Sequence, residues 1–170
     1  MKIRGIKLVL ITCLAGFGQV VFAEEEQPTV VNIKRMSMDV ALRIAQAAIN
    51  QCRKEGVQVA VTVVDRGGHP QVVLRDVLAQ DLSLDISRKK AYTAMTFNMV
   101  TSDMVGRFKE PYSVPKIDTL IISPGGVPVT ASGNIMGGVG VSGAPSGEID
   151  EKCAKAGVAA VIDDLEMATM

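Results

Sequence analysis

The segment Lys89-Lys90-Ala91-Tyr92-Thr93-Ala94 carries the residue types best suited to hold a ligand. It places two cations and two hydroxyl groups among alanines, in a stretch that we expect to be helical. The ammonium groups can meet carboxylates, and the small residues permit close packing against a partner or a flat ligand. A solvated helix face explains the lysines equally well. It explains Thr93 less well, because threonine is a mediocre helix former.

His69 is the only histidine of the chain, so any histidine-dependent chemistry must use it. Imidazole is the commonest metal ligand in proteins. The residue also lies in a predicted hairpin turn beside Pro70, where an exposed polar side chain is ordinary. Both interpretations stay open, with solvation at the tip favoured.

Two further sets of side chains could bind metals. Glu148 and Glu151 lie one helical turn apart and could share a hard cation, although acidic residues in a first helical turn also complement the helix dipole without any partner. Met95 and Met99 could offer thioethers to iron, although methionine more often fills irregular core space. We favour the helix dipole and the core.

The run Gly138 to Gly143 matches the dinucleotide pattern G-x-G-x-x-G. That pattern works only after a strand and at the opening of a helix, whereas these glycines fall inside a predicted strand. Glycine within a strand marks a close approach of backbone. We therefore expect a neighbouring subunit or a flat ligand to approach this strand, and no nucleotide.

The N-terminus has the order of a secretory signal peptide. Lys2, Arg4 and Lys7 precede an apolar run from Leu8 to Phe22, and Ala23 is the expected cleavage position. The run of about 15 residues is shorter than the ~20 that span a bilayer, so we expect no transmembrane segment in the mature chain. The sequence thus predicts a signal peptide at 1–23, a flexible arm at 24–35, one domain at 36–170, and a periplasmic or secreted location.

The charge balance argues against nucleic acid as a partner. Without the signal peptide, 15 basic residues face 18 acidic ones, a formal net charge of −3. The longest basic run, Arg88-Lys89-Lys90, is short, and the chain has no tryptophan. Phosphate backbones need clustered lysine and arginine, and single strands need aromatic stacking platforms.

Two cysteines, Cys52 and Cys153, remain in the mature chain, 101 residues apart. An exported protein occupies a compartment where disulfides persist. Each cysteine nevertheless lies in an apolar helical stripe, as a small buried hydrophobe would. We favour free, buried thiols and leave pairing open.

The hydrophobic periodicity predicts an α+β fold. We expect one antiparallel sheet of about five strands with helices packed on it. The predicted helices follow Ser37, span Asp81 to Met99 and Asp150 to Met167, and a short one lies at Ser102 to Phe108. The predicted strands are Val57 to Asp65, Gln71 to Leu74, Thr119 to Ser123, Val127 to Thr130 and Ile135 to Val141.

A series of short segments carries a family likeness across about Met36 to Leu165. In chain order they are Val64-Asp65, Gly68-His69, Arg75, Lys90 to Ala94, Gly125 to Pro128, Gly137 to Ala144, Asp150-Glu151 and Ala154 to Gly157. The series resembles the GlcG/HbpS family, which includes the C-terminal domain of PduO-type proteins. The segment after Arg75 departs from the family pattern, and the histidine that relatives often carry near Leu82 is missing.

The resemblance implies a profilin-like fold, a homo-oligomer and, as in several members, haem binding. It would assign Thr93 or His69 as a weak axial ligand, Lys89 or Lys90 to the haem propionates, and Tyr92 to the same site. Candidate contacts between subunits are the glycine strand, with Val139, Val141 and Ala144, and the helix face around Ala91 and Ala94.

The leading functional hypothesis is an exported haem-binding protein that acts in haem or iron sequestration, uptake or sensing. One alternative is a haem-degrading or peroxidase-like enzyme, which we favour less because no second histidine, cysteine or tyrosine ligand is evident in a pocket. The other alternative is a non-catalytic oligomeric accessory protein that binds a different small molecule.

Export is directly testable. In a Gram-negative host, mass spectrometry of the purified protein should show an N-terminus near Glu24, because the signal pattern directs cleavage after Ala23. Recovery of intact Met1 from the cytoplasmic fraction would show that the pattern is not used.

Overall fold

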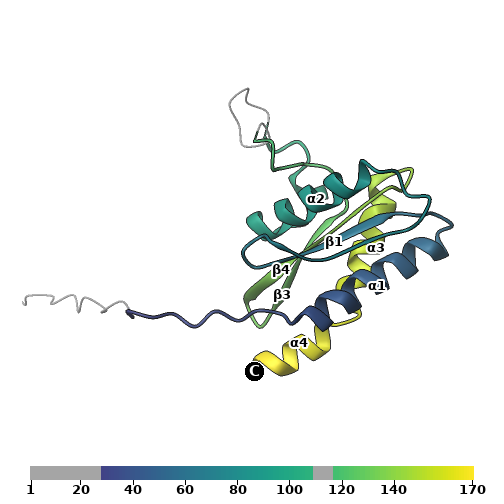
Figure 1. Ribbon diagram of the computed structural model, residues 1–170. Helices are drawn as coiled ribbons and strands as arrows, with labels where there is room; N and C mark the ends of the chain where they lie inside the picture. Colours follow the sequence, from purple (N-terminus) through teal and green to yellow (C-terminus); the bar gives the residue numbers. More distant parts are fainter. Residues whose placement is uncertain (1–27, 109–116) are drawn as a thin grey trace, which may run out of the picture. The chain divides into compact units, whose positions relative to one another are not determined.

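The computed structural model describes residues 28–108 and 117–170 (Figure 1). Residues Ile33–Met170 form one compact unit, and the described residues before it, 28–32, contain no helix or strand. The predicted signal peptide at 1–23, and residues 24–27 of the predicted arm, lie outside the described residues. Within the described ranges, no helix combines the length and apolar character that crossing a membrane requires.

One antiparallel sheet organises the compact unit. Its strands are β1 (Ala60–Asp65), β2 (Pro70–Arg75), β3 (Gly126–Ala131) and β4 (Asn134–Ser142), in the spatial order β2-β1-β4-β3. Both β1–β2 and β3–β4 are hairpins, and the central pair β1–β4 joins them in register, with Val63 opposite Val139. The α+β class and the four strands at these sites agree with the sequence-based prediction.

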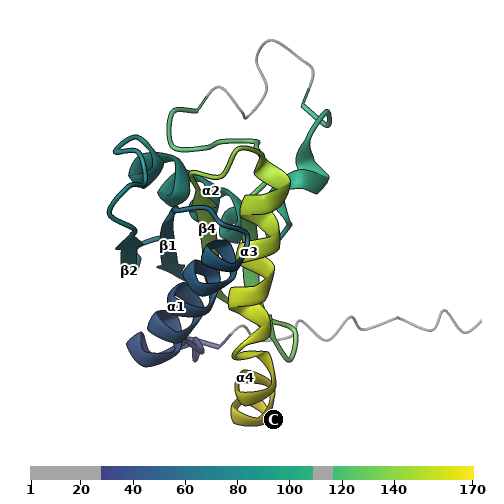
Figure 2. The same ribbon diagram turned by 90° about the vertical axis from the view of Figure 1, so that its right-hand side faces the viewer.

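Helices cover both faces of the sheet. The helix α2 (Ser83–Phe97) lies on one face, and α1 (Met38–Lys54) and α3 (Gly147–Ala159) lie side by side on the other (Figures 1 and 2). A short helix α4 (Ile162–Thr169) ends the chain and packs near β3. The sequence predicted α3 and α4 as one helix from Asp150 to Met167, but the helix breaks after Ala159.

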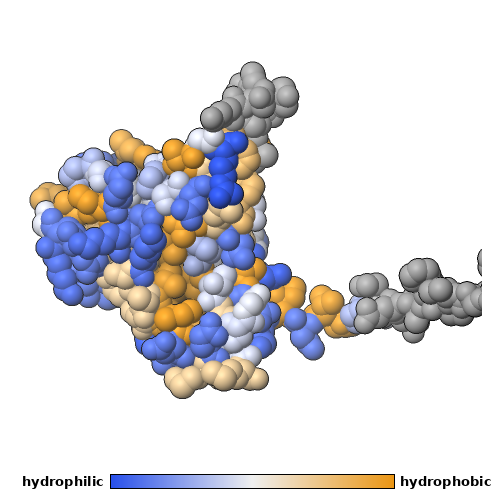
Figure 3. Space-filling model, turned by 180° about the vertical axis from the view of Figure 1, so that it is seen from behind, coloured by the Kyte–Doolittle hydropathy of each residue, from blue (hydrophilic) through white to orange (hydrophobic). Residues whose placement is uncertain are grey.

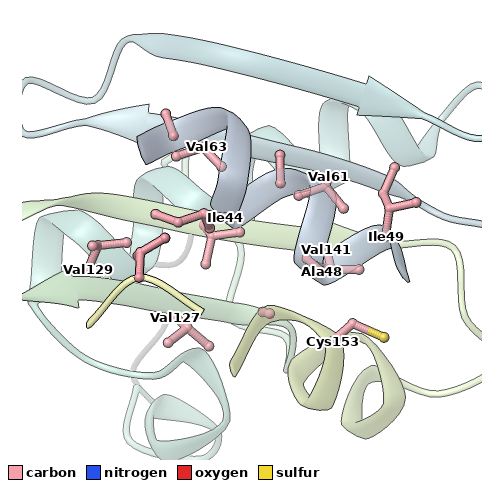
Figure 4. Close-up of a cluster of buried hydrophobic side chains, with 14 of the residues drawn as sticks. Ile44, Ala48, Ile49, Val61, Val63, Val127, Val129, Val141 and Cys153 are labelled. Carbon is pink, nitrogen blue, oxygen red and sulfur yellow. The ribbon is translucent and has the colours of Figure 1, made fainter. Parts of the chain in front are cut away.

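The main core lies between the sheet and the pair α1 and α3 (Figure 4). Helix α1 begins at Ser37, whose hydroxyl oxygen accepts the Val40 N–H at 3.3 Å and satisfies one of the free donors of the first turn. Its buried side presents Ile44 and Ala48 to Val61, among others. Burying each such valine or isoleucine contributes about 1.5–3 kcal/mol.

The second packing layer rests on glycines rather than on large side chains. Gly126, Gly138 and Gly140 face α2, and a Cβ atom at any of them would overlap the α2 backbone, at the carbonyl oxygens of Lys90, Ala91 and Ser87 respectively. Helix α2 therefore lies directly on the sheet backbone. The partner that approaches the glycine strand closely is α2 of the same chain, which corrects the expectation of a subunit or ligand there.

Most of the residues predicted to form contacts between subunits are buried within the chain. Ala91 and Ala94 are fully buried residues of α2, while Val139 and Val141 are fully buried in the main core. Ala144 is only partly buried and packs against that core. The small residues of α2 thus serve helix–sheet packing within one chain.

The predicted strand at Thr119 to Ser123 is wrong, because this segment has no strand structure. The backbone N–H of Ile121 donates instead to the Thr93 hydroxyl oxygen at 3.0 Å, which ties the segment to α2 rather than to the sheet. The predicted helix at Ser102 to Phe108 is a 3₁₀ helix at Thr101–Met104.

The two cysteines form a disulfide, contrary to the favoured expectation of free thiols. Cys52 at the end of α1 and Cys153 in α3 have Cα atoms 5.4 Å apart, and both are fully buried. The sequence placed each correctly in an apolar stripe but could not show that the two stripes face each other. A covalent link across a loop of this length stabilises a fold by about 2–5 kcal/mol.

The close contact between Gly140 and α2 predicts that one added methyl group lowers the stability of the protein strongly. Gly140→Ala should lower the free energy of unfolding by at least about 3 kcal/mol, because the added Cβ overlaps backbone atoms of α2 that cannot rotate away. Urea denaturation measures the loss. Gly67→Ala is the matched control, since a Cβ there meets mainly the flexible His69 side chain, and it should cost less than about 1 kcal/mol. Equal losses would show that the close contact has no special role.

Candidate functional site

The turn between β1 and β2 is built around Asp65. Its Oδ1 atom accepts the backbone N–H groups of Gly67 at 2.8 Å and His69 at 3.0 Å, and Gly68 takes a left-handed conformation with φ +82°. Burial raises the pKa of this carboxyl, but the two N–H donors together with His69 and Arg35 outweigh that effect and lower it. A charged Asp65 therefore fixes the backbone on both sides of the turn.

His69 projects from this turn into solvent. Its side chain is 83% exposed, and its Nδ1 atom lies 3.6 Å from Oδ1 of Asp65. This separation is longer than a hydrogen bond. His69 is thus accessible, and no hydrogen bond within the described residues occupies its ring.

Gly68 brings the hairpin tip against α2. A Cβ atom on Gly68 would overlap the ring of Tyr92 and touch the end of Met95, so only glycine lets the helix lie this close. Gly68, in the turn that carries His69, therefore packs against Tyr92 although the two residues are far apart in the sequence. Met95 packs against the turn, in line with the core interpretation of this methionine.

Lys89 lies one turn before Tyr92 on α2, so the two side chains share one side of the helix. The Lys89 side chain is 27% exposed, and its ammonium group lies 2.8 Å from Asp85, which Arg88 also contacts. The hydrogen bond from Lys89, with help from Arg88, lowers the pKa of Asp85. We call the three outward residues His69, Tyr92 and Lys89 the hairpin–helix surface.

Thr93, in contrast, is fully buried. Its hydroxyl donates to the carbonyl oxygen of Lys89 at 2.7 Å and accepts the N–H of Ile121 at 3.0 Å. Both hydrogen-bonding roles of the hydroxyl are filled within the chain. In this structure Thr93 joins α2 to the segment that follows it and does not reach the surface.

Lys90 is also directed inward and forms a buried ion pair. Its ammonium nitrogen lies 2.8 Å from Oδ2 of Asp150 in α3 and donates to the carbonyl oxygen of Val141 at 3.0 Å, with only 4% of either charged side chain exposed. Oδ1 of Asp150 accepts the N–H of Ala144. Burial raises the pKa of the Asp150 carboxyl, while Lys90 and the Ala144 N–H oppose that rise. Lys90 is therefore occupied in the interior, not at a rim where propionates could meet it.

The two glutamates proposed for a cation have different surroundings. Glu148 is exposed, and its own backbone N–H together with the Ser146 side chain lowers its pKa. Glu151 is buried, and its Oε1 atom accepts from Ser102 at 2.9 Å and from Lys155 at 2.7 Å. Across residues 28–108 and 117–170, no group of three or more histidine, cysteine, aspartate or glutamate side chains could hold a metal ion.

The hairpin–helix surface lies outside two hollows found among the described residues. These hollows have volumes of 290 and 340 Å³, and none of His69, Lys89, Lys90, Tyr92 and Thr93 lines either of them. On the face seen from behind, hydrophobic areas are separated by hydrophilic residues (Figure 3). A flat ligand at this surface would lie against the chain rather than inside it.

The architecture is that of an α+β protein with a four-stranded antiparallel sheet and a helix layer on either face. A family model described as haem degrading protein HbpS-like matches residues 36–159. The chain belongs to this HbpS-like family.

Several known proteins are similar to this chain. GlcG of Escherichia coli K12 is 32% identical over 110 residues, which are 63% of this chain and 81% of GlcG. An uncharacterised 15.0 kDa protein from the dhaT-dhaS intergenic region of Citrobacter freundii is 32% identical over 65% of this chain and 82% of its own length. The crystal structure of HbpS shares 37% identity with a TM-score of 0.74, covering 77% of this chain and 93% of HbpS. A PduOC–haem complex shares 26% identity with a TM-score of 0.67, covering 75% and 95%.

The buried ion pair predicts a pattern of stabilities. Lys90→Met should lower the free energy of unfolding by about 3–5 kcal/mol, because it leaves Asp150 charged in the interior without a partner. The double variant Lys90→Met with Asp150→Leu should lose less, since no buried charge remains. Lys89→Met is the matched control and should change stability by less than about 1 kcal/mol. Chemical denaturation of the unchanged protein, Lys90→Met, Asp150→Leu, the double variant and Lys89→Met tests this. A double variant that loses as much stability as Lys90→Met and Asp150→Leu added together would contradict it.

Proposed function

We propose that this chain is an exported haem-binding protein that acts in haem or iron sequestration, uptake or sensing. The family description names haem, and one similar structure is a haem complex. The observation that carries the proposal here is the exposed imidazole of His69, which lies 3.6 Å from the Asp65 carboxylate on a turn whose Gly68 packs against Tyr92.

The residues of the hairpin–helix surface fit the parts of a haem. A histidine imidazole holds the haem iron of globins and peroxidases. The Tyr92 ring offers a flat apolar contact, and the half-buried Lys89 side chain, whose ammonium is paired with Asp85, would offer a counter-charge to a propionate by sharing or leaving that carboxylate. Haem, when bound, would supply the iron and its redox chemistry, while His69, Tyr92 and Lys89 would bind and orient it.

The ligand assignment therefore moves to His69. Thr93 would have to break its hydrogen bonds to Ile121 and Lys89 before it could meet iron. Lys90 would have to leave Asp150 as an unpaired buried charge. His69 needs no such rearrangement.

The disulfide supports export. Cys52 and Cys153 are paired, and structural disulfides persist in the periplasm and outside the cell, whereas cytosolic reductants keep most thiols reduced. The disulfide and the signal pattern at 1–23 therefore argue independently for the same location.

An open haem surface also favours assembly. A porphyrin that lies against His69 and Tyr92 would leave one apolar side in water, and a second copy of the chain could cover that side. Closed symmetric assemblies are the common form of homo-oligomer. The oligomer remains a proposal, and its contacts would involve residues other than the buried Ala91, Ala94, Val139 and Val141.

Haem degradation is the second candidate, because the family description states that activity. The absorbance spectrum of bound haem distinguishes haem binding from haem degradation. A binder keeps a stable haem spectrum when ascorbate or peroxide is added at low concentration, whereas a degrading enzyme loses the Soret band with repeated turnover of added haemin.

Haemin titration followed in the Soret region tests the proposed site. The unchanged protein should give a saturable spectral shift, His69→Ala should abolish the ligand-dependent part of that shift, and Tyr92→Ala should weaken binding about fivefold, which corresponds to roughly 1 kcal/mol. Lys89→Gln should weaken binding slightly and reduce its salt dependence.

Controls separate the alternatives. Lys152→Gln removes a 61% exposed cation on α3 and should leave the titration unchanged. If Thr93→Val changes the spectrum while His69→Ala does not, Thr93 is the ligand after all. A flat response of the unchanged protein would favour a different small molecule.

A further inference from the structure

A pocket of 340 Å³ lies where the two ends of the compact unit meet. The segment that leads into α1 runs beside α4 (Figures 1 and 2), and the Lys34 ammonium donates to the carbonyl oxygen of Thr169 at 2.6 Å. We call it the chain-end pocket. Its apolar lining comes from Met36, Val40, Met136, Leu165 and Ala168.

The polar groups of the chain-end pocket are mainly donors. Lys34 and Arg35 line it, and no aspartate or glutamate does. The Lys34 ammonium contacts a neutral carbonyl oxygen, so that contact leaves its charge uncompensated. The Arg35 side chain is 61% exposed and has only a long contact of 3.4 Å with Asp65. The pocket thus combines an apolar lining with two cations.

This pocket is a feature of the chain beyond what the family model describes. Lys34, Arg35, Leu165, Ala168 and Thr169 are five of its nine lining residues, and they fall outside the matched residues 36–159. None of His69, Tyr92 and Lys89 lines it. A ligand here would not be the haem of the proposed function.

We propose that the chain-end pocket binds a carboxylate with a short, unbranched or lightly branched apolar chain. The apolar part would lie against Met36 and Leu165, and the carboxylate would meet Lys34 and Arg35. At roughly 30 Å³ for each water-sized group, the volume accommodates about eleven such groups. Octanoate, with about ten non-hydrogen atoms, is matched to that space, and pockets of this size lie at the lower end of the usual range for small ligands.

Isothermal titration calorimetry of octanoate into the purified protein tests the proposal. We expect saturable binding with one site, and binding of octan-1-ol at least about tenfold weaker because it lacks the charge that the cations recognise. Lys34→Gln and Arg35→Gln should each weaken octanoate about three- to tenfold. Ala168→Phe should weaken both ligands by narrowing the pocket, and Lys152→Gln, a matched exposed lysine on α3, should change nothing.

Three results would overturn the proposal. The first is equal affinity for octanoate and octan-1-ol, and the second is unchanged octanoate affinity in Ala168→Phe. The third is binding only by a variant that begins at Ile33, which would show that residues before Ile33 occupy the pocket. The variant Tyr92→Ala keeps the test independent of haem, since loss of octanoate binding in it would place the site at the hairpin–helix surface and also refute the chain-end pocket.

Discussion

The close contact between the α2 backbone and three glycines is the constraint on which the rest of this structure depends. Because Gly126, Gly138 and Gly140 lack side chains, α2 lies directly on the sheet. At this short distance its inward residues must be small or must satisfy their polar groups at once. Ser87 meets Thr62 with their hydroxyl oxygens 2.9 Å apart, and Lys90 reaches across to α3. Close packing and buried polar pairing are therefore two consequences of one arrangement.

The same contact separates the predicted ligand-binding residues into an inward and an outward set. Neighbours in a helix point about 100° apart, so Lys89 and Lys90 cannot serve the same surface. Lys90 and Thr93 connect α2 to α3 and to Ile121, and they hold the helix in place. Lys89 and Tyr92 remain on the side that meets the hairpin tip. The lysine, alanine and threonine pattern that signals the family is thus to a large extent a packing pattern.

Local chemistry let the sequence predict most of the fold. Segments rich in β-branched residues predicted the four strands, Ser37 predicted the start of α1, and the turn residues predicted both hairpins. The predictions that were wrong concern features that depend on contacts between segments far apart in the sequence. The predicted strand at Thr119 to Ser123 was wrong. The backbone N–H of Ile121 in this segment donates to Thr93, 28 residues away, and not to a strand of the sheet. The disulfide was missed because apolar periodicity shows that Cys52 and Cys153 are buried, not that they face one another. A lysine among alanines could have indicated a buried carboxylate partner, but nothing local identified Asp150.

Thr93 and His69, the two candidate iron ligands, differ in the hydrogen bonds that each would have to break. If the buried Thr93 hydroxyl left its partners, the N–H group of Ile121 would lose its acceptor, at a cost of about 1–3 kcal/mol. A neutral hydroxyl is also a weak ligand for iron. His69 already lies in solvent, so it exchanges only water for iron. Burial raises the pKa of Asp65, but the turn's N–H groups, His69 and Arg35 lower it overall, so Asp65 stays charged and keeps the backbone of the turn in place. In the proposed function, this turn would present His69 to the iron, and α2 would be the support against which the turn packs.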